Sequence, residues 1–241
     1  MIDGALRSMR KNNRDRILKT ARQLLPRYGY NGISIRAIAA RARLTTGAIY
    51  FHFKNKKEIY RTICLEAVDI LIKKFRDGVQ SRTTPNQKLI STFDSYIRFF
   101  YEHREHYNIL MEYKAHYHRD EYHHDQEIAQ KMRTMTDLME ETIRQGVEEG
   151  AFREVDARML AILLEAVTEG MLQLKKLGVF ENLKITDVDF RKVMGEIIGR
   201  GILNDSREQG NAPTVPRKIS PKKTSLASLL AHSGDTEKEP S

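Results

Sequence analysis

The chain has 241 residues, a formal net charge of +9 and one cysteine. A single cysteine excludes an intrachain disulfide framework, and no apolar run approaches the roughly 20 residues of a membrane-spanning helix. The segment Met1 to Arg10 lacks the apolar core of a signal peptide. We therefore expect a cytoplasmic protein with no membrane partner, long enough for two domains.

The positive charge is concentrated in the first quarter of the chain. Residues 1–61 contain fifteen Lys or Arg and three Asp or Glu, which is a net charge of +12. Since the whole chain carries +9, residues 62–241 carry −3. Such a basic segment is typical of a nucleic-acid-binding domain, because Lys and Arg neutralise backbone phosphates.

Three short helices are predicted in this basic segment. The first runs from about Asn13 to Tyr28 and has one apolar face. Ser34 is a suitable N-cap for a second helix over residues 35–42. A third, nearly uncharged helix follows a tight turn within residues 44–56. The pair indicates a helix-turn-helix motif, and the concentrated positive charge argues against the alternative of an ordinary helical hairpin.

The same residues resemble the TetR-type bacterial transcriptional regulators. The resemblance runs from residue 14 to 60, and many positions agree in register. Its motifs in this chain are Arg16-Ile17-Leu18, Ala21, Leu24, Tyr28-Gly29-Tyr30, Ser34, Ile38-Ala39, Thr45-Thr46-Gly47-Ala48-Ile49-Tyr50-Phe51-His52-Phe53, Lys56 and Glu58-Ile59.

The resemblance implies roles in binding double-stranded DNA. Positions that match phosphate-contacting residues of the family are Ser34, Tyr50, His52 and Lys56, of which we favour Tyr50 and Lys56. Positions that approach base edges are Thr45, Thr46, Gly47, Ala48 and Phe51, and Arg36 suits either role. The alternative for Tyr50 and Phe51 is partial packing, and for the lysines simple solvation.

Two residues depart from the family pattern. Arg43 stands at the turn position where the family usually has glycine, so a positive φ there would cost on the order of 1 kcal/mol. Pro26 falls in the last turn of the first helix, where it would kink or end that helix.

A long helix is expected to connect the motif to the rest of the chain. Asn55 and Glu58 have the spacing of a capping box, and the helix should run towards Gly78. Cys64 lies within it, and we interpret it as a packed small residue rather than a redox sensor.

The remainder of the chain is predicted to be helical, which makes the protein all-α with about nine helices. Expected starts are Thr84-Pro85, Glu105, Asp125, Asp156 and Thr186 or Asp187, and Gly150 is an expected stop. The expected organisation is a flexible arm (1–12), the DNA-binding domain (13–60, motif about 33–52), an effector-binding and dimerisation domain (61–204) and a disordered tail (205–241).

The resemblance also implies a homodimer formed by the last two helices. Gly195 and Gly199 lie four residues apart on one face and would permit close helix approach, although local flexibility is an equal alternative. The candidate interface residues are Leu163, Val167, Met171, Val193, Gly195, Ile197 and Gly199. Two recognition helices about one DNA turn apart would read a palindromic operator.

An effector site is expected among the aromatic residues of the middle helices, where the family encloses a small-molecule cavity. The candidates are Phe93, Tyr96, Phe100, Tyr107, Tyr113, Tyr117, Glu165 and Glu169. The alternatives are a plain helix core for the aromatic residues and solvent exposure for the two glutamates, which otherwise would suit a cation.

Six histidines between residues 103 and 124 raise the question of a metal: His103, His106, His116, His118, His123 and His124. No HExxH motif or cysteine supports such a site, so we predict no metal and no cofactor. We predict a ligand-responsive regulator without catalytic residues, most simply a repressor released from its operator by an effector. The alternatives are a sequence-tolerant architectural DNA-binding protein and a metal-using enzyme.

Overall fold

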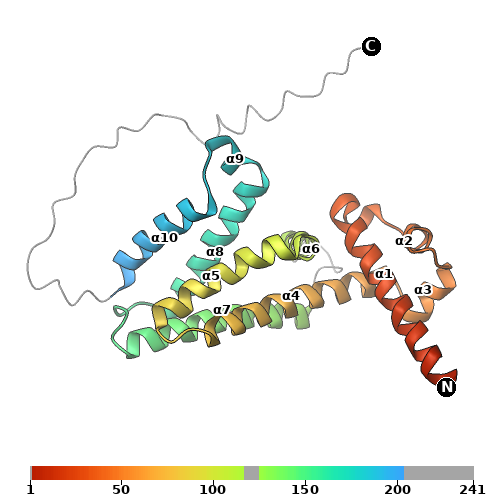
Figure 1. Ribbon diagram of the computed structural model, residues 1–241, viewed down its shortest axis with the longest axis horizontal. Helices are drawn as coiled ribbons and strands as arrows, with labels where there is room; N and C mark the ends of the chain where they lie inside the picture. The colour runs from red at the N-terminus through yellow and green to blue at the C-terminus, as the bar shows by residue number, and fades with distance from the viewer. Residues whose placement is uncertain (1, 117–124, 204–241) are drawn as a thin grey trace, which may run out of the picture. The chain divides into compact units, whose positions relative to one another are not determined.

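The computed structural model describes residues 2–116 and 125–203, and its regular elements are all helices (Figure 1). The predicted all-α fold is confirmed. The chain divides into two compact units, Met1–Glu169 and Gly170–Ser241. The predicted tail at 205–241 lies outside the described residues. None of the described helices combines the length and apolar character that a membrane span requires.

Three helices form a small core at the start of the first unit. α1 (Ile2–Gly32) packs against α2 (Ile35–Ala42) and α3 (Thr46–His52), and α2 also contacts α3. The predicted helix-turn-helix is present. Four large aliphatic side chains in this core, Ile17, Leu18, Ile38 and Ile49, are at most 2% exposed.

The first helix differs from the prediction at its start. α1 begins at Ile2, so residues 2–12 are helical where an arm over residues 1–12 was expected, and the flexibility of that segment stays a prediction. The reason lies in composition, because the segment after Gly4 has no Gly or Pro and includes the strong helix formers Ala5, Leu6 and Met9.

The break near the end of α1 falls at a glycine. Gly29 has φ 67° and ψ 171°, whereas Pro26 lies inside the helix. The predicted end near Tyr28 is therefore correct, but its cause is Gly29, which adopts a positive φ without the steric cost of a Cβ.

α4 (Lys56–Gln80) joins the motif to the other helices of the first unit. It contacts α1 and also α5 (Pro85–Glu102), α6 (Arg104–His116) and α7 (Gln126–Glu148). The expected domain boundary at residue 60 is therefore not a boundary between compact units. Cys64 is fully buried, as predicted for a packed residue.

Most predicted helix caps are present. The side chains of Asn55, Thr84, Asp125 and Thr186 accept hydrogen bonds from the first turns of α4, α5, α7 and α10 (Asp187–Ile202). At α4 the return bond differs, because Glu58 accepts the N–H of Lys54 at 2.6 Å.

α8 (Ala157–Lys176) begins in the first unit and ends in the second. In the second unit α9 (Val179–Leu183) is an additional short helix, so the described residues contain ten helices where about nine were expected. The Phe180 and Phe190 ring centroids lie 6.0 Å apart, and Lys175 Nζ donates to Asp187 Oδ1 at 2.6 Å. These contacts join the end of α8, α9 and α10.

Candidate DNA-binding surface and sensing core

α3 exposes a polar and aromatic surface while one aliphatic residue anchors it. Thr45 Oγ1 accepts the N–H of Ala48 at 3.1 Å, which caps the helix. Ile49 is fully buried, whereas Tyr50 is 56% exposed and Phe51 is 61% exposed. Thr46 and Gly47 are exposed as well. Both aromatic side chains are therefore more than half accessible to a partner, and the remainder of each is covered by the protein, so partial packing stays an alternative.

α2 and the turn hold α3 in place. Ser34 Oγ accepts the N–H of Ala37 at 3.1 Å at the start of α2, and its hydroxyl hydrogen is still available to a phosphate. Arg36 on the first turn is exposed. Arg43 ends α2 with φ 52° and ψ 47°, so the strained turn predicted at this residue is present.

Arg16 stabilises the same turn from α1. Its Nη2 donates to the carbonyl oxygen of Ala42 at 2.7 Å, one of the carbonyls that the end of a helix leaves without a partner. Arg16 belongs to the family pattern in the sequence, but no contact was predicted for it. A single sequence carries no signal for a bond across 26 residues.

Lys56 has partners inside the protein. Its Nζ donates to the carbonyl oxygens of Tyr30 at 2.7 Å and Ile33 at 3.0 Å, and it lies 4.2 Å from the Tyr30 ring centroid. Burial lowers the pKa of this ammonium. Two of its three N–H donors are thus engaged in joining α4 to the end of α1, which is a structural role that sequence reasoning missed.

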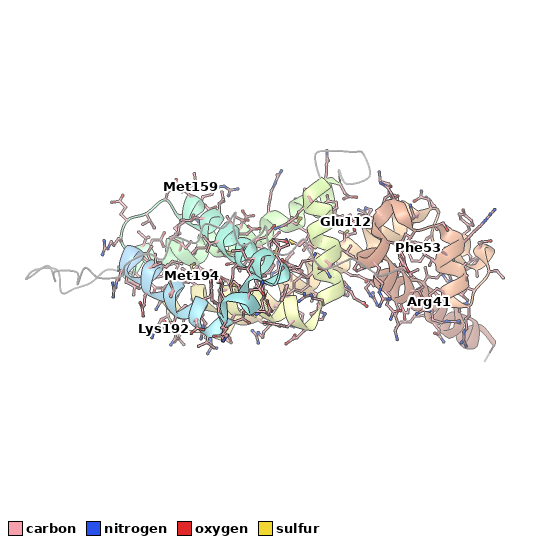
Figure 2. All side chains as sticks on the ribbon, turned by 90° about the horizontal axis from the view of Figure 1, so that it is seen from above. Arg41, Phe53, Glu112, Met159, Lys192 and Met194 are labelled. Atoms are coloured by element: carbon pink, nitrogen blue, oxygen red, sulfur yellow. The ribbon has the colours of Figure 1, made fainter. Side chains whose placement is uncertain are left out.

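α6 contacts α1 directly. Glu112 Oε1 accepts the N–H of Tyr30 at 2.9 Å, and Figure 2 shows Glu112 on the side of α6 nearest the DNA-binding helices. Arg22 on α1 donates to Glu66 on α4 at 2.7 Å, and His106 on α6 lies 3.8 Å from the same carboxylate. Three helices therefore meet where the motif joins the rest of the unit.

Part of the predicted effector group gathers around Lys114. Lys114 Nζ binds Glu165 Oε1 at 3.2 Å and also binds Glu169, which Tyr96 Oη contacts at 3.4 Å. Burial alone would lower the pKa of Lys114, but Tyr96 and the two carboxylates outweigh it and raise the pKa. The two glutamates are neither freely exposed nor open to a cation without competition from Lys114, a residue that sequence reasoning missed.

Aromatic rings line this cluster. Tyr107 lies 4.9 Å from Phe100 and 6.4 Å from Tyr96, measured between ring centroids. Tyr107 is fully buried, and its hydroxyl has no hydrogen-bond partner in the part of the chain that the structure describes. Burial raises the pKa of Tyr107 to about 12, so the hydroxyl stays protonated at neutral pH and is a donor.

Tyr113, another of the predicted sensing residues, contacts α7. Tyr113 Oη exchanges hydrogen bonds with the backbone of Asp125 at 3.2 and 3.3 Å, at the start of α7. Phe93 is half-buried, and Tyr117 lies outside the described residues. A hollow of about 360 Å³ opens between α4 and α5, but its lining contains none of the predicted sensing residues.

The histidine cluster is only partly described. The imidazoles of His103 and His106 lie 5.9 Å apart, whereas His118, His123 and His124 lie outside the described residues. Within residues 2–116 and 125–203, no three His, Cys, Asp or Glu side chains are grouped as metal ligands.

The candidate dimer residues differ in exposure. Leu163 is 56% exposed, Val193 is 53% and Ile197 is 65%. A Cβ added at Gly195 would meet no atom within 4 Å. Val167 and Gly199 are of intermediate exposure. Met171 is only 2% exposed and cannot offer its side chain to a partner, so this candidate is corrected.

Two segments of the chain match models of known protein families. The family described as "Bacterial regulatory proteins, tetR family" matches residues 17–63, and "Tetracyclin repressor-like, C-terminal domain" matches residues 82–173.

Individual relatives agree with these matches. The transcriptional activator FasR of Mycolicibacterium smegmatis is 23% identical over 160 residues, which cover 66% of this chain and 70% of FasR. The repressor KstR2 of the same organism is 27% identical over 82 residues, only 34% of this chain and 40% of KstR2. The solved structure of the TetR family regulator PfmR from Thermus thermophilus has a TM-score of 0.58 at 24% identity, covering 65% of this chain and 84% of PfmR, and so shares the fold. Together with the helix-turn-helix in the basic segment, these matches show that the chain belongs to the TetR family of bacterial transcriptional regulators.

Proposed function

We propose that the protein is a ligand-responsive repressor that binds a palindromic operator as a homodimer and leaves it when a small-molecule effector binds. The observation that carries the DNA contact is the exposed surface of α3. Tyr50 and Phe51 are more than half exposed there, beside the N-cap residue Thr45, within a segment of net charge +12. A helix of this kind fits the major groove, with bases at its centre and phosphates at its rim.

The dimer is supported by apolar side chains that the single chain leaves in water. Leu163 on α8 and Val193 and Ile197 on α10 are each more than half exposed. A family member that reads two half-sites needs two recognition helices, and these side chains would become buried between two copies of the chain.

The effector response is supported by the Lys114 cluster. It combines charged groups, aromatic rings and the unpaired hydroxyl of Tyr107, which is the mixture that fixes a small molecule in a helical pocket. Lys114 and Glu112 lie on the same helix, α6, and Glu112 holds the backbone of Tyr30. An effector that shifts α6 would therefore act on the motif directly, in addition to acting through α4.

A selection experiment tests the DNA-binding proposal. A random duplex library is enriched on the purified protein at about 0.15 M salt and the retained DNA is sequenced. A palindromic consensus supports a dimeric specific regulator, and enrichment without a consensus would instead favour an architectural DNA-binding protein. Loss of expression of a reporter placed behind the consensus operator distinguishes a repressor from an activator.

A matched pair of variants tests the surface. Tyr50→Phe removes only a hydroxyl and should weaken operator binding by about 0.5–1.5 kcal/mol per half-site. Tyr101→Phe makes the same change on α5, where the side chain is 50% exposed, and should leave affinity unchanged. Equal affinities for both variants and the wild type would remove Tyr50 from the proposed contact.

A further inference from the structure

The start of α1 is a helical extension beyond the three-helix core. Residues 2–12 continue the helix that packs on α2 and α3, and Figure 1 shows the N-terminal end of α1 running on past α3. At about 1.5 Å per residue, this extension adds about 16 Å. Among residues 11–32 of α1, whose burial the structure describes, the first buried residue is Ile17, and Lys11 and Arg14 before it are exposed.

Basic residues in this extension share one helical face. Positions 7, 10, 11 and 14 are spaced i, i+3, i+4 and i+7, which places them in a single stripe, and they hold Arg7, Arg10, Lys11 and Arg14. Asp3 is the only acidic residue before Arg14. Like charges at these spacings repel each other and disfavour an isolated helix, and a bound polyanion would remove that repulsion.

Arg14 shows which way the stripe faces. Its guanidinium carbon lies 5.3 Å from the ring centroid of Phe53, the residue that ends α3. Arg14 and Lys11 are both exposed. The face of α1 that carries the stripe therefore lies beside the end of α3. The helical register continues the same face from Arg14 towards the N-terminus.

We propose that residues 2–12 form a second DNA-contacting element, in which Arg7, Arg10 and Lys11 bind backbone phosphates outside the half-site that α3 reads. This inference rests on the proposed operator binding. About 16 Å of helix corresponds to about 5 base pairs of duplex, so each end of the footprint lengthens by about that amount. Phosphate contacts carry no base information, so the extension adds affinity without changing the consensus.

The test is the salt dependence of operator binding by the full chain. Each phosphate contact contributes about 0.9 to the slope of log K against log salt concentration. The variant R7A/R10A/K11A removes three charges per subunit and six per dimer, so the slope should become shallower by about 5. Alanine is the strongest helix former, so the extension stays helical, which circular dichroism verifies.

Two further variants separate position from charge. R76A/R82A/R133A removes the same number of charges from exposed sites on and after α4 and on α7, and its slope should equal that of the wild type. R7K/R10K keeps the charge in the extension and should keep the wild-type slope. Hydroxyl-radical footprinting should show that R7A/R10A/K11A loses protection only at the flanks.

The outcomes distinguish this inference from the proposed function. An unchanged slope for R7A/R10A/K11A with intact operator selection overturns the inference and leaves the function. An equal reduction in R76A/R82A/R133A shows a general charge effect and also overturns it. If R7A/R10A/K11A changes the consensus at the flanking positions, the extension reads bases, and the proposal of phosphate contacts is overturned. Failure of the wild-type protein to retain any duplex overturns both proposals.

Discussion

Some basic side chains of the DNA-binding helices hold the domain together. Arg16 binds the carbonyl of Ala42 at the end of α2, and Lys56 binds the carbonyls of Tyr30 and Ile33. Tyr50 instead faces solvent on α3. The basic residues behind the net charge of +12 in this segment therefore serve two purposes: some bind groups inside the domain and others are available to DNA. Mutations distinguish these two purposes.

Lys56→Ala should lower the free energy of unfolding by about 1–3 kcal/mol, because it leaves two buried carbonyls without their charged donor. Lys54→Ala removes the same charge from an exposed side chain two residues away and should change stability by less than about 0.5 kcal/mol. Chemical denaturation of both variants measures the difference. Equal stability of the two would show that the Lys56 contacts contribute nothing to folding.

Arg43→Gly should raise the free energy of unfolding by about 1 kcal/mol, because glycine adopts the φ of 52° without strain. Arg41→Gly is the matched control: it removes the same charge from the last turn of α2, where glycine should cost about 1 kcal/mol. Urea titrations should therefore move the two midpoints in opposite directions. A lower midpoint for Arg43→Gly means that its side chain stabilises the turn by more than the strain costs.

At the scale of elements, helix ends were predictable and close approaches were not. Asn55, Thr84, Asp125 and Thr186 cap their helices because capping uses a side chain and a backbone N–H only two or three residues apart. Gly146 on α7 is different. Phe152 lies so near that an added Cβ would come within 2.1 Å of its ring. The two residues are only six apart, and the turn at Gly150 (φ 69°) lets the Phe152 N–H donate to the Gly146 carbonyl at 2.9 Å, a contact that the sequence analysis did not predict.

Gly146→Ala should therefore destabilise the protein, although alanine normally favours a helix interior by about 1 kcal/mol. The expected loss is about 1–3 kcal/mol, the usual cost of overpacking a core. A double-mutant cycle with Phe152→Ala supplies the control: once the ring is absent, Gly146→Ala should be stabilising. Thermal unfolding of the four proteins measures the coupling, and additive effects would contradict the clash.

For the molecule as a whole, the proposed homodimer makes predictions about the exposed apolar side chains of α8 and α10. The apolar side chains that remain in water on α8 and α10 include Leu163, Val193 and Ile197, while Met171 is buried within its own chain. Large exposed apolar patches mark interaction surfaces, so these side chains support the proposed dimer.

Ile197→Glu should convert the dimer to a monomer, because an unpaired carboxylate is costly in an apolar interface. Operator affinity should fall about ten-fold or more as the second half-site contact is lost. Ile90→Glu on α5, where the side chain is 37% exposed, is the control and should remain dimeric. Sedimentation equilibrium reads the mass directly; a dimer that tolerates Ile197→Glu places the interface elsewhere.

Features that depend on neighbours along the chain could be predicted from the sequence. The apolar spacing of α2, the cap at Ser34, the strained turn at Arg43 and the excess of positive charge in residues 1–61 all follow from residues close together in sequence. The distant partners of charged side chains depend on the tertiary structure. Lys56 with Tyr30, Glu112 with the same residue, and Lys114 with Glu165 are separated by 26, 82 and 51 residues. Such pairs form only once helices pack, because packing sets which residues of different helices become neighbours.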